Sequence, residues 1–136
     1  MRPRRPPHPL EHHASFRAVI AAAPPLAELA TRLIANGRAP RNGDLTELAR
    51  CASDPSAADL VGALAIACGD LADGFAAPPA SRKRITAHQR AWIAVREIDR
   101  AVTAAARRRL APPEIVRRAQ RAIDRADVLI GALLPA

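Results

Sequence analysis

Apolar residues recur at helical spacing along the C-terminal part of the chain. Over residues 113–134 they are separated alternately by four and three positions, which is the heptad pattern of a helix packed along one face. Pro112-Pro113 precede this pattern, and proline suits the first turn of a helix. The sequence therefore predicts a last helix over 113–134. Its apolar seam is Ile115, Ala119, Ala122, Ala126, Leu129 and Leu133, widened by Val116, Ile123, Ile130 and Leu134.

Two further long helices are predicted upstream, each bounded by prolines and a capping residue. Asp54-Pro55 begins one over about 55–77, and Pro78-Pro79 ends it. Ser81 can cap the next one, over about 81–109. Gly62 and Gly69 each weaken the first of these helices by roughly 1 kcal/mol relative to alanine, a cost that would be offset if another backbone crossed closely there. The apolar face of that helix is Leu60, Leu64, Ala67, Leu71 and Phe75.

The first helical region is predicted to be interrupted. Ser15 can cap an apolar helix over 16–23, which must stop or kink at Pro24-Pro25 because proline lacks the N–H that the helix needs. A second piece starts at Pro25 and ends at Asn36-Gly37. A short helix is expected after Asp44, beyond a turn-rich link over 38–43.

These elements predict an all-α fold, an antiparallel four-helix bundle with a broken first helix. The bundle is expected over 14–136 as one domain. Residues 1–13, rich in proline, arginine and histidine, are expected to form a disordered basic arm. Composition agrees, since 49% of the 136 residues are hydrophobic but only one Trp, two Phe and no Tyr are present. The scarcity of strand formers excludes all-β and α/β classes.

Charge changes the picture because it is concentrated in one half of the chain. The net charge is +8, and residues 81–136 alone account for it with twelve arginines and Lys83 against five acids. At 100° per residue, the arginines of the two last helices fall into arcs of about 120° and 100°. If these helices are neighbours, the arcs form one basic surface, to which Arg109 adds. The residues concerned are Arg82, Arg90, Arg96, Arg100, Arg107, Arg108, Arg117, Arg118, Arg121 and Arg125.

An arginine-rich surface of this kind is typical of polyanion binding, because the planar guanidinium group grips phosphate. Aromatic residues for base stacking are absent from both arcs, so we expect backbone contacts, with RNA or an RNA–protein complex as the partner. The alternatives are a solvated helix face without a partner and a surface that binds an acidic protein. The best-placed contacts are Arg96, Arg100, Arg107, Arg117, Arg121 and Arg125.

Catalytic motifs are absent, so we expect a non-enzymatic protein with no cofactor and no metal. One enzymatic alternative remains, since Arg82 and His88 have the R-x5-H spacing that resembles the loose ribonuclease motif of HEPN domains. His88 is otherwise expected to be structural, and Trp92 to anchor a core or subunit contact. Cys51 and Cys68 lack metal-ligand spacing and are expected to be reduced, buried thiols.

The sequence carries no predicted membrane span or signal peptide. The longest weakly polar run, over 60–69, is about half the length needed to cross a bilayer. The basic start is followed by only a short apolar stretch, which Pro24-Pro25 ends. We therefore expect a cytoplasmic protein that does not engage a membrane.

The order of elements from residue 60 onwards forms a recognisable layout. It begins with small and aliphatic residues over 60–64 and 71–74, followed by a polar loop and a helix around 92–102. It ends with a proline-started helix that contains Ala119-Gln120, Ile123 and residues 129–131. It resembles the bacterial four-helix-bundle family that includes proteins encoded in ribosomal RNA intervening sequences and the accessory variability determinant of diversity-generating retroelements. The first 59 residues depart from that family, which usually opens with one long helix. The resemblance implies a homo-oligomeric bundle, a basic pentameric barrel in the retroelement members, that associates with a reverse transcriptase and nucleic acid.

Overall fold

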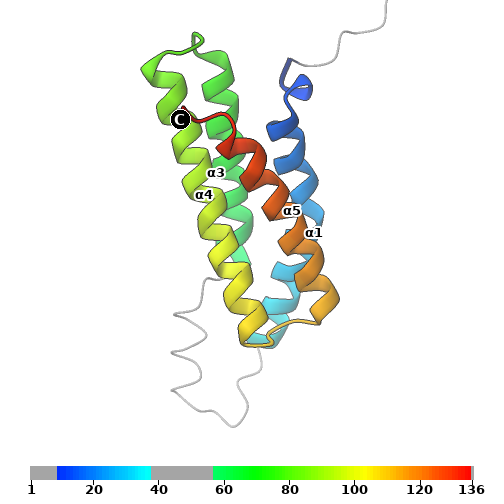
Figure 1. Ribbon diagram of the computed structural model, residues 1–136. Helices are drawn as coiled ribbons and strands as arrows, with labels where there is room; N and C mark the ends of the chain where they lie inside the picture. The colour runs from blue at the N-terminus through cyan, green and yellow to red at the C-terminus, as the bar shows by residue number, and fades with distance from the viewer. Residues whose placement is uncertain (1–8, 38–56, 136) are drawn as a thin grey trace, which may run out of the picture.

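The protein is all-α throughout the residues that the computed structural model describes, 9–37 and 57–135. A 3-10 turn, η1 (Pro9–His12), precedes α1 (Ala14–Gly37), and α3 (Ala57–Ala76), α4 (Arg82–Arg107) and α5 (Pro113–Gly131) follow. Each helix packs on two neighbours: α1 on α3 and α5, and α4 on the same two. The helices run alternately up and down, which confirms the predicted antiparallel four-helix bundle (Figure 1). The link over 38–43, the short helix after Asp44 and the Asp54-Pro55 cap lie outside the described residues.

The helix ends follow the local signals of the sequence. Ser81 is the N-cap of α4, and its side-chain oxygen accepts a hydrogen bond from the Arg84 N–H at 3.2 Å, as predicted. Helix α5 begins at Pro113, also as predicted. Helix α4 ends in a Schellman motif, in which the Leu110 N–H donates to Ala105 O at 3.1 Å and Arg109 has a φ of 53°.

The prediction of a broken first helix is wrong. Helix α1 is assigned continuously from Ala14 to Gly37 with Pro24 and Pro25 inside it, and Ser15 is a buried residue of its first turn. Pro24 is exposed, so part of the lost backbone hydrogen bonding faces solvent. Leu26 and Leu29, both fully buried, hold the same helix against the core after the prolines. Tertiary packing thus overrides the local preference of the proline pair.

Residues 9–13, which the pattern assigns to a disordered arm, are ordered. After the η1 turn, the ring of His13 stacks on that of Phe75 near the end of α3, with centroids 3.6 Å apart and 7° between planes. The first eight residues of the expected arm lie outside the described part of the chain.

The core forms from the apolar faces that the heptad spacing predicts. Along α5 the fully or almost fully buried positions include Ile115, Ala119, Ala126 and Ile130, whereas Leu133 lies beyond the helix end and is 36% exposed. Almost half of the buried apolar side chains among the described residues are alanine, so the helices pack closely. Among the described residues, nothing lies within 4 Å of a Cβ built at Gly62 or Gly69, so no close backbone crossing there offsets the helix-weakening effect of these glycines.

Candidate nucleic-acid interface

The ten predicted contact arginines all lie at the surface of two neighbouring helices. Five belong to α4, four to α5, and Arg108 caps the C-terminus of α4. All ten side chains are exposed, and α4 packs directly on α5. The two basic arcs therefore belong to adjacent elements, as the prediction of a shared surface requires.

Two of these arginines form ion pairs between helices. Arg118 Nη2 lies 3.5 Å from Glu28 Oε1, which connects α5 to α1, and Arg96 Nη1 lies 3.9 Å from Asp127 Oδ1, which connects α4 to α5. The four side chains are between 33% and 58% exposed, so each pair contributes about 0–1 kcal/mol to stability. Arg108 also makes an intramolecular interaction.

The other seven guanidinium groups form no ion pair within residues 9–37 and 57–135. They are therefore available to an anionic partner in a way that Arg96 and Arg118 are not. These seven are Arg82, Arg90, Arg100, Arg107, Arg117, Arg121 and Arg125.

Trp92 ties Arg96 more firmly to the protein surface. The guanidinium carbon of Arg96 lies 4.9 Å from the centroid of the indole ring, a cation–π distance, while the indole packs against the core. The expected role of Trp92 as a core anchor is consistent with this position. With one face on an indole and one edge towards Asp127, Arg96 has less freedom to bind phosphate than the prediction assumed.

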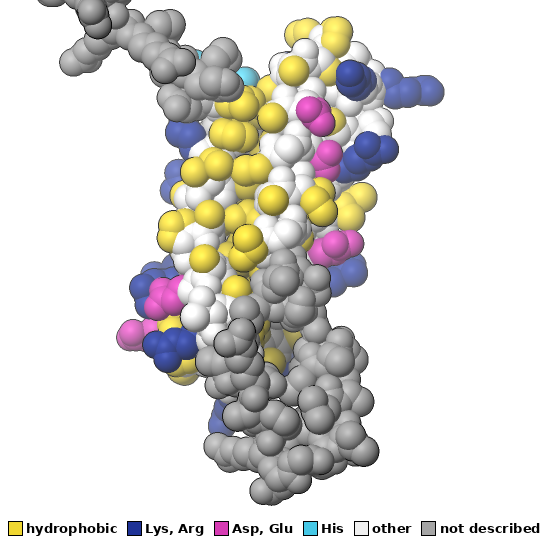
Figure 2. Space-filling view, turned by 180° about the vertical axis from the view of Figure 1, so that it is seen from behind, with side chains coloured by type: hydrophobic (Ala, Val, Ile, Leu, Met, Phe, Trp, Pro, Cys, Tyr) yellow, Lys and Arg dark blue, Asp and Glu magenta, His cyan; other side chains and the backbone are white. Residues whose placement is uncertain are grey.

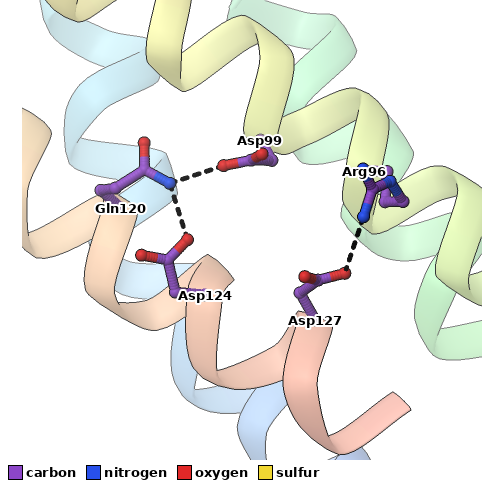
Figure 3. A network of polar contacts seen from close by, with 5 residues as sticks. All are labelled: Arg96, Asp99, Gln120, Asp124 and Asp127. Carbon is purple, nitrogen blue, oxygen red and sulfur yellow. Dashed lines mark hydrogen bonds and ion pairs between the residues drawn. The ribbon is translucent and has the colours of Figure 1, made fainter. Parts of the chain in front are cut away.

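Acidic residues separate the two basic arcs along the middle of the α4–α5 boundary. Gln120 Nε2 donates to Asp99 Oδ1 on α4 at 2.6 Å and to Asp124 Oδ1 on its own helix at 2.8 Å (Figure 3). Neither of these carboxylates has an ion pair within the described ranges, and Asp127 lies further along the same boundary. Because a phosphate is repelled by these carboxylates, they divide the basic surface into two arcs with an acidic boundary between them.

The arcs converge at the turn that joins α4 to α5. Arg107 and Arg108 end α4, Arg109 follows in the left-handed conformation, and Arg117 lies in the second turn of α5. We call these four residues the basic turn. Arg109 and Arg117 both line a cavity of about 700 Å³, whose remaining lining is mostly apolar and includes Leu110, Pro112, Val116 and one amide side chain, Gln120.

His88 belongs to a buried cluster that connects the N-terminal turn, the end of α3 and the start of α4. Its ring is 3% exposed and meets the edge of Phe75, with centroids 4.9 Å apart. Arg84 donates from Nε to Gly74 O at 2.8 Å and from Nη2 to Phe75 O at 2.9 Å. These bonds reach carbonyl groups in the last turn of α3, where Gly74 O also accepts from the Ala77 N–H at 3.2 Å.

The environment of His88 disfavours its charged form. Burial is the largest cause that lowers its pKa, and the positive charges of Arg84 and His13 lower that pKa further. The imidazole Nε2 has no hydrogen-bond partner among the described residues. His88 is thus a neutral packing residue of the cluster, in agreement with the structural role expected for it.

The geometry does not support the ribonuclease alternative. Arg82 is exposed at the start of α4, whereas His88 is buried, and six residues along a helix place the two side chains about 120° apart. A general acid or base must come within hydrogen-bond reach of its substrate, and a ring that is 3% exposed does not reach an RNA phosphate.

No metal centre or membrane span is present in the part of the chain that the structure describes. No group of three His, Cys, Asp or Glu side chains there is arranged to hold a metal ion, and none of its helices is long and apolar enough to cross a bilayer. Cys68 is a free, half-buried thiol, and burial raises its pKa. Cys51 lies outside the described residues.

No protein-family model matches the sequence, and searches of curated proteins and of solved structures return no match. The class that the fold defines is therefore an all-α four-helix bundle with an arginine-rich α4–α5 surface. The resemblance over residues 60–134 is not supported by a match at the level of family.

Two features of this surface were missed by helix-wheel reasoning. The contact of Gln120 with Asp99 depends on the relative height of α4 and α5, which spacing within one helix does not report. The contacts of Arg84 depend on how the turn over 77–81 folds the chain back. The sequence signal for the contacts of Arg84 was the position of His88, a histidine on an apolar helix side, close in sequence to Arg84 and to Gly74-Phe75.

Proposed function

We propose that this protein is a non-enzymatic helical bundle that binds RNA, alone or in an RNA–protein complex, through backbone phosphates. The observation that carries the proposal is the set of seven exposed arginines on α4 and α5 without an ion pair within the described residues. Guanidinium groups that have no acid partner gain most from a phosphate, because no existing pair has to be broken.

The basic turn is the preferred point of contact. Arginines 107–109 and Arg117 outnumber the one acidic residue between them, Glu114 in the first turn of α5, and the carboxylates of Asp99, Asp124 and Asp127 lie further along the helices. A single strand can bend around such an end more readily than a rigid duplex can lie along the acidic boundary. We therefore place the RNA backbone at the basic turn and extend it along the α5 arc over Arg121 and Arg125.

The test is a titration of fluorescently labelled single-stranded RNA at low salt, read by anisotropy. The double variant Arg117→Glu and Arg121→Glu is expected to weaken binding by at least tenfold, because each change replaces a phosphate contact with a repulsive charge. Lys83→Glu is the matched control for a single reversal, since Lys83 is exposed at the opposite end of α4. It is expected to change the affinity by less than about threefold, by the long-range charge effect alone.

The outcome is unambiguous in both directions. Absence of RNA binding by the wild-type protein at low salt contradicts the proposal. The proposal is also contradicted if the double variant and Lys83→Glu lose the same RNA affinity per reversed charge. Binding would then depend on the net charge of the protein and not on this surface.

An acidic protein surface is the second candidate partner, and the boundary of Asp99, Gln120 and Asp124 favours it. A protein partner can place cations opposite these carboxylates and acids opposite the arginines, whereas RNA offers only one sign of charge. A pull-down from lysate before and after nuclease treatment separates the two. Recovery of the same partner protein without nucleic acid supports this candidate over RNA.

We further propose association with a reverse transcriptase, which rests on the resemblance of residues 60–134 alone. The observation to seek is a reverse-transcriptase gene beside this one together with near-repeat DNA segments. A genomic neighbourhood without them contradicts this extension and leaves the RNA-binding proposal standing.

A further inference from the structure

The face of the bundle formed by α1 and α3 is apolar at its centre over its described part. Seen from behind, this face shows hydrophobic side chains gathered over both helices, with the charged side chains at its two edges (Figure 2). Two large residues on it are well exposed, Ile20 at 50% and Val61 at 46%. We define the α1/α3 face by Ile20, Ala23, Ala27, Val61, Ala65 and Ala72.

Helical geometry places these residues on one side of the bundle. On α1 the ion pair of Glu28 with Arg118 marks the flank next to α5, and the three α1 members of the face lie on the opposite flank, next to α3. Thr31, further along α1, turns its hydroxyl back to donate to Ala27 O at 2.9 Å, so it presents no unsatisfied donor to a partner.

We propose that this face binds a second copy of the chain to form a two-fold dimer. Burial of exposed apolar surface favours association, and an isologous contact lets both copies bury the same face. The proposal is independent of RNA binding, because it involves α1 and α3 and leaves α4 and α5 exposed.

The distribution of charge favours association of two copies through the α1/α3 face over association through another face. Each chain carries +8, and the α4–α5 surface carries most of the described arginines, so two copies repel each other wherever arginines meet. The six members of the α1/α3 face are apolar, and the exposed charged side chains of α1 and α3 lie at its edges (Figure 2). Packing these faces together also places the two α4–α5 surfaces on opposite outer sides, where the distance between like charges is greatest.

The members of the face extend over residues 20–27 of α1 and 61–72 of α3, which is about 18 Å along α3. The exposed alanines allow the opposing helices to approach closely over this length.

The test measures the molecular mass in solution without nucleic acid, by sedimentation at protein concentrations of tens of micromolar. The wild-type protein is expected at twice its monomer mass of 14.5 kDa. Ile20→Glu and, separately, Val61→Glu are expected to shift the mass to that of the monomer, because each places buried carboxylates at the two-fold contact.

Ile93→Glu is the matched control, because Ile93 is 54% exposed on α4, outside this face. It is expected to remain dimeric, and circular dichroism is expected to show the same helix content for all three variants. A monomeric wild-type protein, an assembly that Ile20→Glu leaves intact, or dissociation by Ile93→Glu as well would each overturn the proposal.

Discussion

At Gly74 the backbone of α3 lies directly against the imidazole of His88. A Cβ built on this glycine would lie 2.5 Å from Cδ2 and 2.6 Å from Nε2 of the ring. The ring is buried between α3, α4 and Phe75, so it has little room to move away. The absence of a side chain at residue 74 is therefore a packing requirement, although the sequence pattern drew attention to Gly62 and Gly69 instead.

Gly74→Ala is expected to lower the free energy of unfolding by about 1–3 kcal/mol, the usual cost of forcing extra atoms into a packed site. Urea denaturation followed by circular dichroism measures it. Gly69→Ala is the control, because a Cβ there meets nothing within 4 Å and alanine is the better helix former, so stability should rise by about 0.5–1 kcal/mol. An unchanged or raised stability for Gly74→Ala contradicts the described packing.

His88 makes stability depend on pH. In the unfolded chain it takes up a proton as the pH falls through about 6.5, whereas its lowered pKa in the folded state delays that uptake to lower pH. Below about pH 6.5 the unfolded state therefore binds more protons, and the free energy of unfolding is expected to fall as the pH decreases from 7 to 5.

His88→Gln removes this titrating group and should flatten the decline, which urea denaturation at several pH values measures. His12→Gln, at an exposed histidine of η1, is the control and should retain the wild-type pH dependence. If His88→Gln and the wild type lose stability equally steeply, the buried imidazole is not the source of the effect.

Among the elements, α1 is where sequence and structure differ most. The proline pair predicts a break, but the helix continues because Val19, Ala22, Leu26 and Leu29 on its other side are buried. Pro24 is exposed within the helix and still withholds a backbone hydrogen bond. The continuity of α1 therefore comes from tertiary contacts and is opposed by local conformational preference.

Pro24→Ala is expected to raise the free energy of unfolding by about 1–3 kcal/mol, because it restores a donor and removes a steric clash inside the helix. Thermal or urea denaturation measures the change. Pro113→Ala is the control at the first position of α5, where proline is favourable, and it should not stabilise the protein. Stability that Pro24→Ala leaves unchanged would argue that α1 is interrupted after all.

The other elements could be predicted because their signals are local. Ser81 and Pro113 begin α4 and α5 where capping chemistry indicates, and the heptad spacing identifies most of the buried face of α5. Contacts that depend on the register between elements could not be predicted in this way. The stacking of His13 on Phe75 is one example, since the two residues are far apart in sequence and belong to different elements.

The whole molecule has two unlike faces on opposite sides of the bundle. Among the described residues, the α4–α5 side carries most of the arginines, and the α1/α3 face is apolar at its centre (Figure 2). The arginine arcs of the candidate site were predictable, because position on one helix follows from spacing. The acidic boundary between the arcs was not, because Asp99 joins Asp124 and Asp127 of α5 only through the packing of α4 on α5.

The salt dependence of RNA binding tests the central claim most directly. For a single strand, the logarithm of the binding constant falls with the logarithm of the salt concentration by about 0.7 per phosphate contacted. With three or more contacts at the basic turn and the α5 arc, the affinity of the wild-type protein should fall roughly tenfold or more between about 50 and 200 mM salt. The Arg117→Glu and Arg121→Glu double variant should show a shallower slope. Absence of binding at about 50 mM salt, or an affinity that salt leaves unchanged, would contradict the assignment of this surface to an RNA backbone.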